Sequence, residues 1–147
     1  LDADTMDRID TLNRVRIQRA WEVMTSTGKG LAEWQDSTGA PVLPLSACYP
    51  LVFDVEKDWL NARIAKRFDL MLAQGALEEV EAVRPTYDPS LPAHRAIGVP
   101  ELMGYLQGQL TLDESRTKAV IATRRFAKRQ RTWMRSKMAN WHRIRPD

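Results

Sequence analysis

The chain has 147 residues, enough for one domain or for part of a larger one. A hydrophobic content of 44% and a charged content of 28% are typical of a soluble globular protein, and no apolar run is long enough to predict a membrane span. The single cysteine excludes an internal disulfide, and with two histidines it gives no recognisable zinc-binding spacing.

Two helices are predicted before residue 30. Residues 4–10 can form a short helix, and a longer amphipathic pattern begins at Asn13, a suitable N-cap, and ends at Gly28, where a left-handed cap is expected. Residues 27–30 read Thr-Gly-Lys-Gly, but a phosphate loop needs a glycine where Val23 stands and a Ser or Thr after the lysine. Helix termination explains this stretch better.

One strand is predicted in the chain. After a further helical turn at 31–35, residues 37–50 are rich in Pro, Ser and Gly and indicate a connection. Residues 51–55 are short and apolar, like a buried parallel strand. Because a lone strand cannot pair with itself, we expect the rest of its sheet to lie outside the chain. The start at Leu1, without an initiating Met, also suggests a fragment.

Helices dominate the remainder of the sequence. Three are predicted between the strand and residue 108, at 57–73, 77–83 and 101–106. Residues 84–93 contain three prolines and indicate a loop, whereas Pro100 suits the first turn of the third helix, which Gly108 should end.

A long amphipathic helix is predicted from about residue 112 to residue 138. Thr111 and Glu114 have the spacing of a capping box at its start. Residues of a mixed apolar stripe recur every three or four positions on one face. The stripe consists of Val120, Thr123, Ala127, Gln130, Met134 and Met138, with Phe126 and Trp133 beside it.

The charge of this last helix is one-sided. Residues 116–146 contain eleven Lys or Arg and no Asp or Glu, so that residues 116–147 carry a net charge of +10 and residues 1–115 carry −7. Solvated surface helices usually intersperse acids at i,i+4 to relieve repulsion. We therefore expect an external anion to bind this helix, with nucleic acid as the first candidate.

Several segments, taken together and in order, carry a resemblance to a known family. The first group is RIQRA at 16–20, followed by 22–23 and 27–29, and the second is 63–64 and RFDLML at 67–72, followed by 75 and 79–80. The third group is 91–92, RAIG at 95–98 and 101–102. The fourth is TRRFAKRQ at 123–130, followed by 132–133. In these segments the chain resembles the tRNA dimethylallyltransferases, also called isopentenyl-tRNA transferases, over nearly its whole length.

The resemblance implies a mainly α chain: the helical C-terminal part of a P-loop-like α/β enzyme, with one short parallel strand from an otherwise missing sheet. Residues 1–49 would be the end of a helical tRNA-binding insertion and a connection, and residues 50–147 the C-terminal part of the core with its long basic helix. The family transfers a dimethylallyl group from its diphosphate to N6 of the adenosine 3′ of the anticodon. Its phosphate loop and general base have no counterpart here, so no catalytic residue is expected in this chain.

The resemblance also assigns binding residues. Arg67 would bind the diphosphate, although a salt bridge to Asp69 or another acid is the alternative. The implied tRNA contacts are Arg16, Ile17, Gln18 and Arg19; Arg95, Ala96, Ile97 and Gly98 around the reacting nucleotide; and Arg124, Arg125, Lys128, Arg129 and Gln130 along the anticodon stem-loop. From the residues alone, a solvated face explains the first group equally well, and a turn explains Gly98 nearly as well. Val99 and Pro100 depart from an aromatic and a basic residue in many family members, which puts contacts there in doubt.

The implied partners are the tRNA anticodon stem-loop, dimethylallyl diphosphate and the missing N-terminal half of the same protein. That half would bind most of a Mg²⁺ cofactor, and we expect a cytoplasmic monomer at full length, with no membrane partner. Alone, the fragment should bind tRNA weakly and catalyse nothing. Two alternatives stay open: a non-enzymatic helical nucleic-acid-binding module, and an interaction domain whose basic helix meets an acidic protein.

Overall fold

The computed structural model describes residues 1–145 and divides into two compact units, Leu1–Cys48 and Tyr49–Asp147. Residues 146 and 147, the end of the predicted 50–147 stretch, lie outside the described part. The division falls beside the predicted boundary at residue 49, while the roles assigned to the two stretches stay predictions. Among the described helices, none is both long and apolar enough to cross a membrane.

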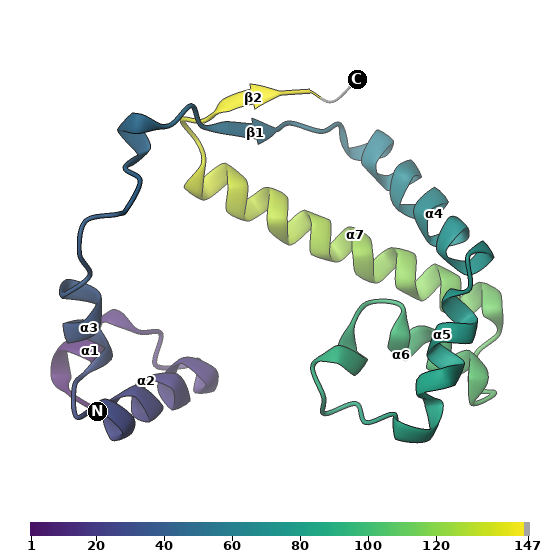
Figure 1. Cartoon of the computed structure of the whole chain (residues 1–147), viewed down its shortest axis with the longest axis horizontal. Coiled ribbons are helices and arrows are strands. Elements are labelled where there is room, and N and C mark those ends of the chain that lie inside the picture. The colour runs from purple at the N-terminus through teal and green to yellow at the C-terminus, as the bar shows by residue number, and fades with distance from the viewer. Residues whose placement is uncertain (146–147) are drawn as a thin grey trace. The chain divides into compact units, whose positions relative to one another are not determined.

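The first unit consists of three helices, α1 (Ala3–Arg8), α2 (Arg14–Thr27) and α3 (Leu31–Asp36) (Figure 1). The Asn13 side chain caps α2 by accepting hydrogen bonds from the first free backbone N–H groups of the helix. Gly28 ends α2 with a left-handed φ of 72°. The Thr-Gly-Lys-Gly stretch is therefore a helix terminus, as predicted, and not a phosphate loop.

Polar contacts hold α1 against α3, because the unit has little apolar core. Thr5 is buried, and its hydroxyl accepts a hydrogen bond from the Ala32 backbone N–H at 3.0 Å. The Arg8 guanidinium donates to both carboxylate oxygens of Asp36, at 2.6 and 2.8 Å. This guanidinium also keeps the pKa of Asp36 below its usual range.

The second unit contains a two-stranded parallel sheet. Strand β1 (Leu51–Phe53) pairs with β2 (His142–Ile144), with Val52 opposite Arg143. The predicted strand is thus present, two residues shorter than expected, but it has a partner within the chain that we did not predict. The sequence His-Arg-Ile carries neither alternation nor a continuous apolar run, so nothing local marked it as a strand.

Four helices make up most of the second unit, and all four follow the sequence prediction to within a few residues. They are α4 (Lys57–Ala73), α5 (Ala76–Val83), α6 (Val99–Leu106) and α7 (Leu112–Lys137). Single 3-10 turns occur at Leu45–Ala47 in the first unit, and at Arg84–Thr86 and Ala93–Arg95 in the loop between α5 and α6. Thr111 and Glu114 form the predicted capping box at the start of α7.

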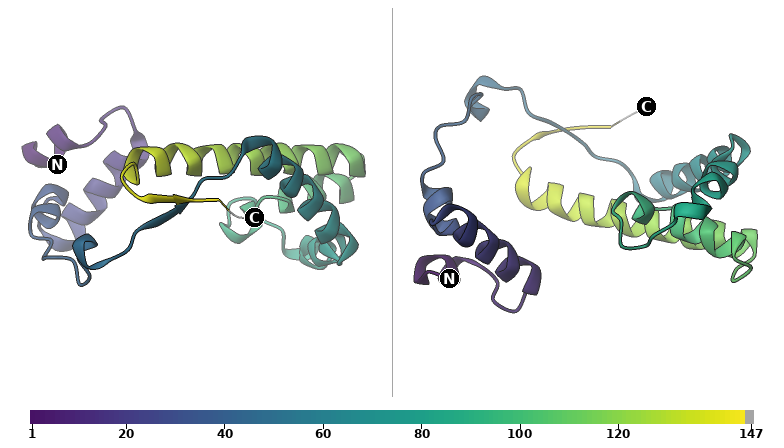
Figure 2. Two further views of the ribbon diagram at one scale, coloured as in Figure 1. Left: turned by 90° about the horizontal axis from the view of Figure 1, so that it is seen from above. Right: turned by 60° about the horizontal axis from the view of Figure 1, so that its bottom comes forward.

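The core of the second unit lies where α4, α5 and α6 meet the first turns of α7 (Figures 1 and 2). Its buried members are Phe68, Val80, Leu102, Met103, Ala119 and Val120. Within the described part of α7, no residue beyond Val120 is buried. Along the predicted stripe, Thr123, Ala127 and Met134 are half-buried and Gln130 is exposed. The C-terminal half of α7 therefore leaves the core with its apolar stripe only partly covered.

An ion pair fixes α7 to α4 beside this core. The Arg116 guanidinium donates to both carboxylate oxygens of Asp69, with Nη2–Oδ2 at 2.7 Å. This bidentate geometry is the strongest form of an Arg–carboxylate contact. The hydrogen bonds from Arg116 lower the pKa of Asp69, and those to Asp69 raise the pKa of Arg116.

We expect the Asp69–Arg116 pair to stabilise the second unit in a pH-dependent way. Because the pKa of Asp69 is lower in the folded than in the unfolded state, its contribution is present above the unfolded pKa and is lost as the pH falls through the folded value. Asp69→Asn should therefore lower Tm at neutral pH but not in strong acid. The exposed Glu81→Gln is the control, and equal Tm values for wild type and Asp69→Asn at neutral pH would contradict the expectation.

Both backbone conformation and packing against this core favour glycine at position 98. Its φ of +106° is rarely adopted by other residues, and a Cβ there would lie 3.3 Å from Phe68 Cε2. We expect Gly98→Ala to reduce the free energy of unfolding by about 1–3 kcal/mol. Gly108→Ala is the matched control, because Gly108 also has a positive φ but open space around its Cα. Denaturant titration would measure both, and an equal loss in the two variants would exclude the packing part of the explanation.

Candidate functional site

Most cations of α7 form no ion pair with a carboxylate of residues 1–145. Within residues 1–145, the acid-free stretch forms ion pairs only through Arg116, with Asp69, and through Arg143, whose Nη1 lies 3.5 Å from Asp54 Oδ1. No described carboxylate forms an ion pair with Arg124, Arg125, Lys128, Arg129, Arg131, Arg135 or Lys137. The described carboxylates therefore leave most of the basic helix without ion pairs, which agrees with an external anionic partner.

A cavity of about 440 Å³ lies between β1, α4 and α7. Its apolar lining includes Val52, Phe53, Leu60, Ile64, Phe126, Ala127 and Met134. Its cationic lining consists of Arg67, Arg131, Arg135 and Arg143. An apolar cavity with several guanidinium groups suits a molecule that joins a small hydrocarbon group to a polyanion.

Arg67 enters this cavity from α4. Its alternative role, a salt bridge to Asp69, is excluded by the geometry, because the Asp69 carboxylate is engaged by Arg116 through both oxygens. Within the described residues no other acid forms an ion pair with Arg67. The guanidinium is thus available to an anion, although diphosphate binding itself stays a prediction.

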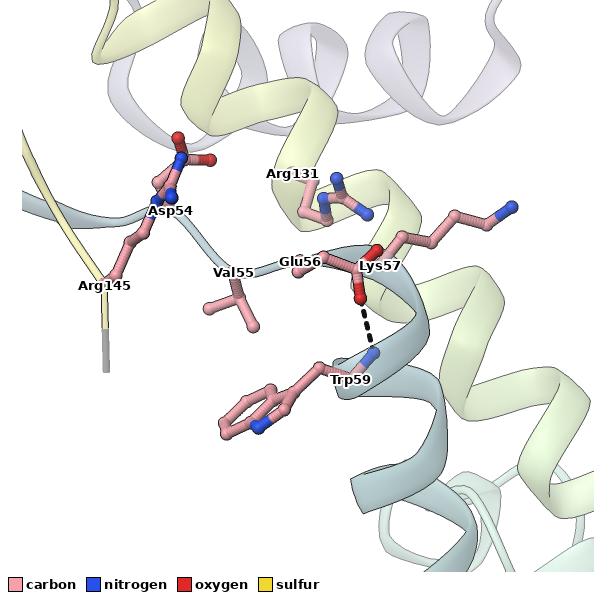
Figure 3. Close-up of a pocket in the computed structure, with 7 residues that line it drawn as sticks. All are labelled: Asp54, Val55, Glu56, Lys57, Trp59, Arg131 and Arg145. Carbon is pink, nitrogen blue, oxygen red and sulfur yellow. Dashed lines mark hydrogen bonds between the residues drawn. The ribbon is translucent and has the colours of Figure 1, made fainter. Parts of the chain in front are cut away.

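A second pocket of about 670 Å³ surrounds the start of α4 (Figure 3). Its lining contains two acidic residues, Asp54 and Glu56, and Glu56 caps α4, because its carboxylate accepts a hydrogen bond from the Trp59 N–H at 2.7 Å. The pKa of Glu56 is lowered mainly by the backbone N–H groups of Asp58 and Trp59, with a smaller contribution from Arg131. Since a carboxylate already occupies the anion-binding end of the helix, this pocket is a poor anion site.

A groove between α4 and α7 contains three of the four predicted RNA-binding cations of α7. It has a volume of about 610 Å³ and no acidic residue in its lining. Its cations are Lys57, Arg124, Arg125, Lys128, Arg131 and Arg135. Arg129 instead lines a shallow hollow on the outer side of α7, together with Arg125 and Lys128, whereas Gln130 faces the inner cavity with Arg67. The five predicted tRNA-contacting residues of this helix therefore lie on different sides of it.

The predicted contacts on α2 lie in the first unit and differ in availability. Gln18 Nε2 donates to Glu22 Oε1 at 2.9 Å, and Arg19 Nη1 lies 3.6 Å from the other oxygen of the same carboxylate. Arg16 is exposed and forms no ion pair within the described residues, while Ile17 is half-buried. Arg16 is thus the most available cation of this group.

The predicted contacts at 95–98 lie in the turn before α6. Arg95 Nη2 donates to the Ser90 carbonyl at 2.7 Å, which ties the guanidinium to its own loop. Ala96 and Ile97 are exposed, whereas Gly98 is buried and packs on Phe68. The left-handed backbone and this packing give Gly98 a structural reason to be glycine, and its contact with RNA stays a prediction.

The structure adds three arginines to the cavity that the sequence analysis did not assign to a site. Arg131 and Arg135 flank the partly covered stripe of α7, one helical turn apart, so their spacing beside Ala127 and Met134 was a usable signal. Arg143 could not have been found in this way, because its position depends on the unpredicted strand β2.

Metal binding has little support from the residues near Arg67. Residues 1–145 contain no group of three or more His, Cys, Asp or Glu side chains that could hold a metal ion. Magnesium prefers oxygen ligands, whereas the cavity's polar lining is mostly guanidinium, and its carboxylate, Asp54, pairs with Arg143. The described residues therefore do not fit a magnesium site of their own.

Comparison with protein families gives one clear match. The family described as IPP transferase matches residues 1–137. A tRNA dimethylallyltransferase of Roseobacter denitrificans is 65% identical over 99% of this chain and 52% of its own length. A tRNA dimethylallyltransferase of Ruegeria sp. is 56% identical over 99% of this chain and 51% of its own length.

Two crystal structures resemble the fold. A tRNA isopentenylpyrophosphate transferase of Bacillus halodurans has a TM-score of 0.63 and 29% identity, over 98% of this chain and 42% of its own. A tRNA delta(2)-isopentenylpyrophosphate transferase of Staphylococcus epidermidis has a TM-score of 0.61 and 28% identity, over 98% of this chain and 46% of its own. The chain thus spans about half the length of the relatives it matches, in their C-terminal half.

Proposed function

The chain belongs to the IPP transferase family, and on that premise we propose that it supplies the tRNA contacts and part of the diphosphate site of a tRNA dimethylallyltransferase. The observation that carries this proposal is a pair of surfaces on α7. One is an apolar cavity that contains Arg67, and the other is formed by cations that have no ion pair with a described carboxylate. The first suits a prenyl diphosphate, and the second suits an RNA backbone.

The proposed reaction places chemical demands on both surfaces. Transfer of the dimethylallyl group to adenosine N6 forms a carbon–nitrogen bond, breaks the carbon–oxygen bond to the diphosphate, and releases one proton from the amine. Negative charge grows on the departing diphosphate, and a positioned guanidinium stabilises it. Arg67 has this role in our proposal, while the apolar lining of the cavity receives the five-carbon group.

The RNA partner in this proposal is the anticodon stem-loop of tRNA. Sequence-specific proteins read unpaired RNA bases in loops, and the reacting adenine must leave its stack to meet the allylic carbon. Arg124, Arg125, Lys128 and Arg129 would hold phosphates, and the α2 and 95–98 residues would contact the neighbouring nucleotides. Val99 and Pro100 offer no cation, Pro100 has no backbone N–H, and the Val99 N–H donates to the Ala96 carbonyl, so no phosphate contact is assigned to these two residues.

The remaining components would come from the half of the relatives that this chain does not match. We assign to that half the phosphate loop, the general base and most ligands of a Mg²⁺ ion, which would help to neutralise the diphosphate. The described residues of this chain do not fit the ion. We further propose that the full-length protein is a cytoplasmic monomer, and that this chain alone is inactive.

Replacement of Arg67 tests the diphosphate site. In the full-length enzyme containing this chain, Arg67→Ala should lower the rate of transfer from labelled dimethylallyl diphosphate to tRNA by about 10²-fold, because the leaving group loses a charge-assisted hydrogen bond. Arg67→Lys should recover part of the rate. Lys66→Ala, on the exposed side of the same helix, is the control and should leave the rate unchanged. An unchanged rate in Arg67→Ala would remove this residue from the site.

Salt dependence tests the RNA surface with this chain alone. We expect tRNA binding to weaken as salt rises, by roughly 0.7–0.9 log units of affinity per log unit of salt for each phosphate contact. Replacing Arg124, Arg125 and Arg129 by Ala should reduce the slope by about two to three. Replacing Lys66 and Arg84, which line none of the three hollows along α7, should change it little. If polyglutamate competes as well as RNA of equal charge, the helix serves an acidic protein and the RNA proposal fails.

A further inference from the structure

Trp133 is a large aromatic side chain on the outer side of α7. It is 55% exposed and lines a shallow hollow of about 620 Å³. The other lining residues also come from α7: Arg125, Lys128, Arg129, Thr132 and Ser136. The hollow therefore combines one indole with three cations and two hydroxyl groups, without an acidic residue.

The core does not explain this tryptophan. Trp133 is absent from the lining of the inner cavity, whose α7 members include Phe126, Ala127 and Met134. It also does not belong to the buried cluster of the second unit. Trp133 therefore remains accessible to a ligand, on a solvated face where three cations line the same hollow.

Two other exposed tryptophans differ from Trp133 because a cation covers the ring, whereas Trp21, which is 58% exposed, is uncovered by the described cations, like Trp133. The Lys29 ammonium lies 5.7 Å from the ring centroid of Trp34, and the Arg63 guanidinium lies 4.7 Å from that of Trp59. Within the described residues no such contact covers Trp133, and the nearby Arg129 lies instead over Phe126, at 5.6 Å. The Trp133 indole is thus more than half exposed, and Arg125, Lys128 and Arg129 line the same hollow.

An open aromatic face among unpaired cations is suited to single-stranded nucleic acid. A base stacks on the ring, and the cations hold the flanking phosphates. Arg129 and Trp133 lie one helical turn apart, about 6 Å along the axis. An apolar protein segment could cover the indole, but it would leave Arg125, Lys128 and Arg129 without counter-charge. RNA supplies both a base for the indole and phosphates for the cations.

We propose that Trp133 stacks on an unpaired base of the bound RNA, while Lys128 and Arg129 bind the adjoining phosphates. The proposal rests on the function proposed above and adds a recognition element for single-stranded character. It makes the outer side of α7 sensitive to whether RNA bases are free, which phosphate contacts alone cannot achieve.

The test compares an RNA hairpin carrying a single-stranded loop with a blunt duplex of equal charge, each binding to this chain. Trp133→Leu, which keeps apolar bulk without a π-face, and Trp133→Ala should weaken hairpin binding by about 5- to 150-fold and leave duplex binding unchanged. Trp133→Phe should retain most of the affinity. Trp34→Ala, an exposed tryptophan of the first unit, is the control. Circular dichroism would establish that each variant folds.

The outcomes separate this inference from the function on which it rests. If the chain binds the hairpin with the expected salt dependence but Trp133→Leu and Trp133→Ala bind as tightly as wild type, the stacking proposal is wrong and the proposed function stands. Equal losses for hairpin and duplex would also overturn stacking, because they indicate a structural role. If the chain binds neither RNA, the proposed function fails as well.

Discussion

The packing of the first turns of α7 against α4, α5 and α6 is the constraint on which the second unit depends. Ala119 and Val120 are buried there beside Phe68, Leu102 and Met103, and the Asp69–Arg116 pair lies at the edge of the same contact. This packing sets the direction of the α7 turns that follow Val120, because a helix held rigidly at one end projects its remaining turns in a fixed direction. The groove, the cavity and the outer hollow are three sides of that projecting segment.

Concentrating cations on one helix has an energetic cost. Like charges at i,i+4, such as Arg124 with Lys128 and Arg131 with Arg135, destabilise a helix by about 0.2–0.5 kcal/mol per pair. In the described chain these residues form no ion pair with acids, so the cost is offset by packing elsewhere in the unit. A polyanion would relieve the repulsion when it binds, and binding and stability of α7 should therefore rise together.

Residue types that act on their neighbours in sequence predicted most of the fold. Contacts between segments far apart in the sequence were not predicted. Asn13, Gly28 and the pair Thr111–Glu114 act through neighbours in sequence, so the ends of α2 and the start of α7 followed from residue types alone. Strand β2 did not, because its pairing with β1 joins segments far apart in the chain. The same distinction holds for the site: cations of α7 were visible in the sequence, whereas their meeting with Arg67 around one cavity required the packing of α4 on α7.

The parallel pairing of β1 with β2 has a consequence for how the chain reaches its native state. Leu51 pairs with His142, so a ladder of three residues per strand closes a loop that contains all four helices of the unit. Closing this loop costs conformational entropy, and only a few hydrogen bonds between the strands offset that cost. The helices, in contrast, form from short-range contacts. The sheet should thus be the last element to assemble and the first to open, and its amide protons should exchange with solvent before those of α4 and α6.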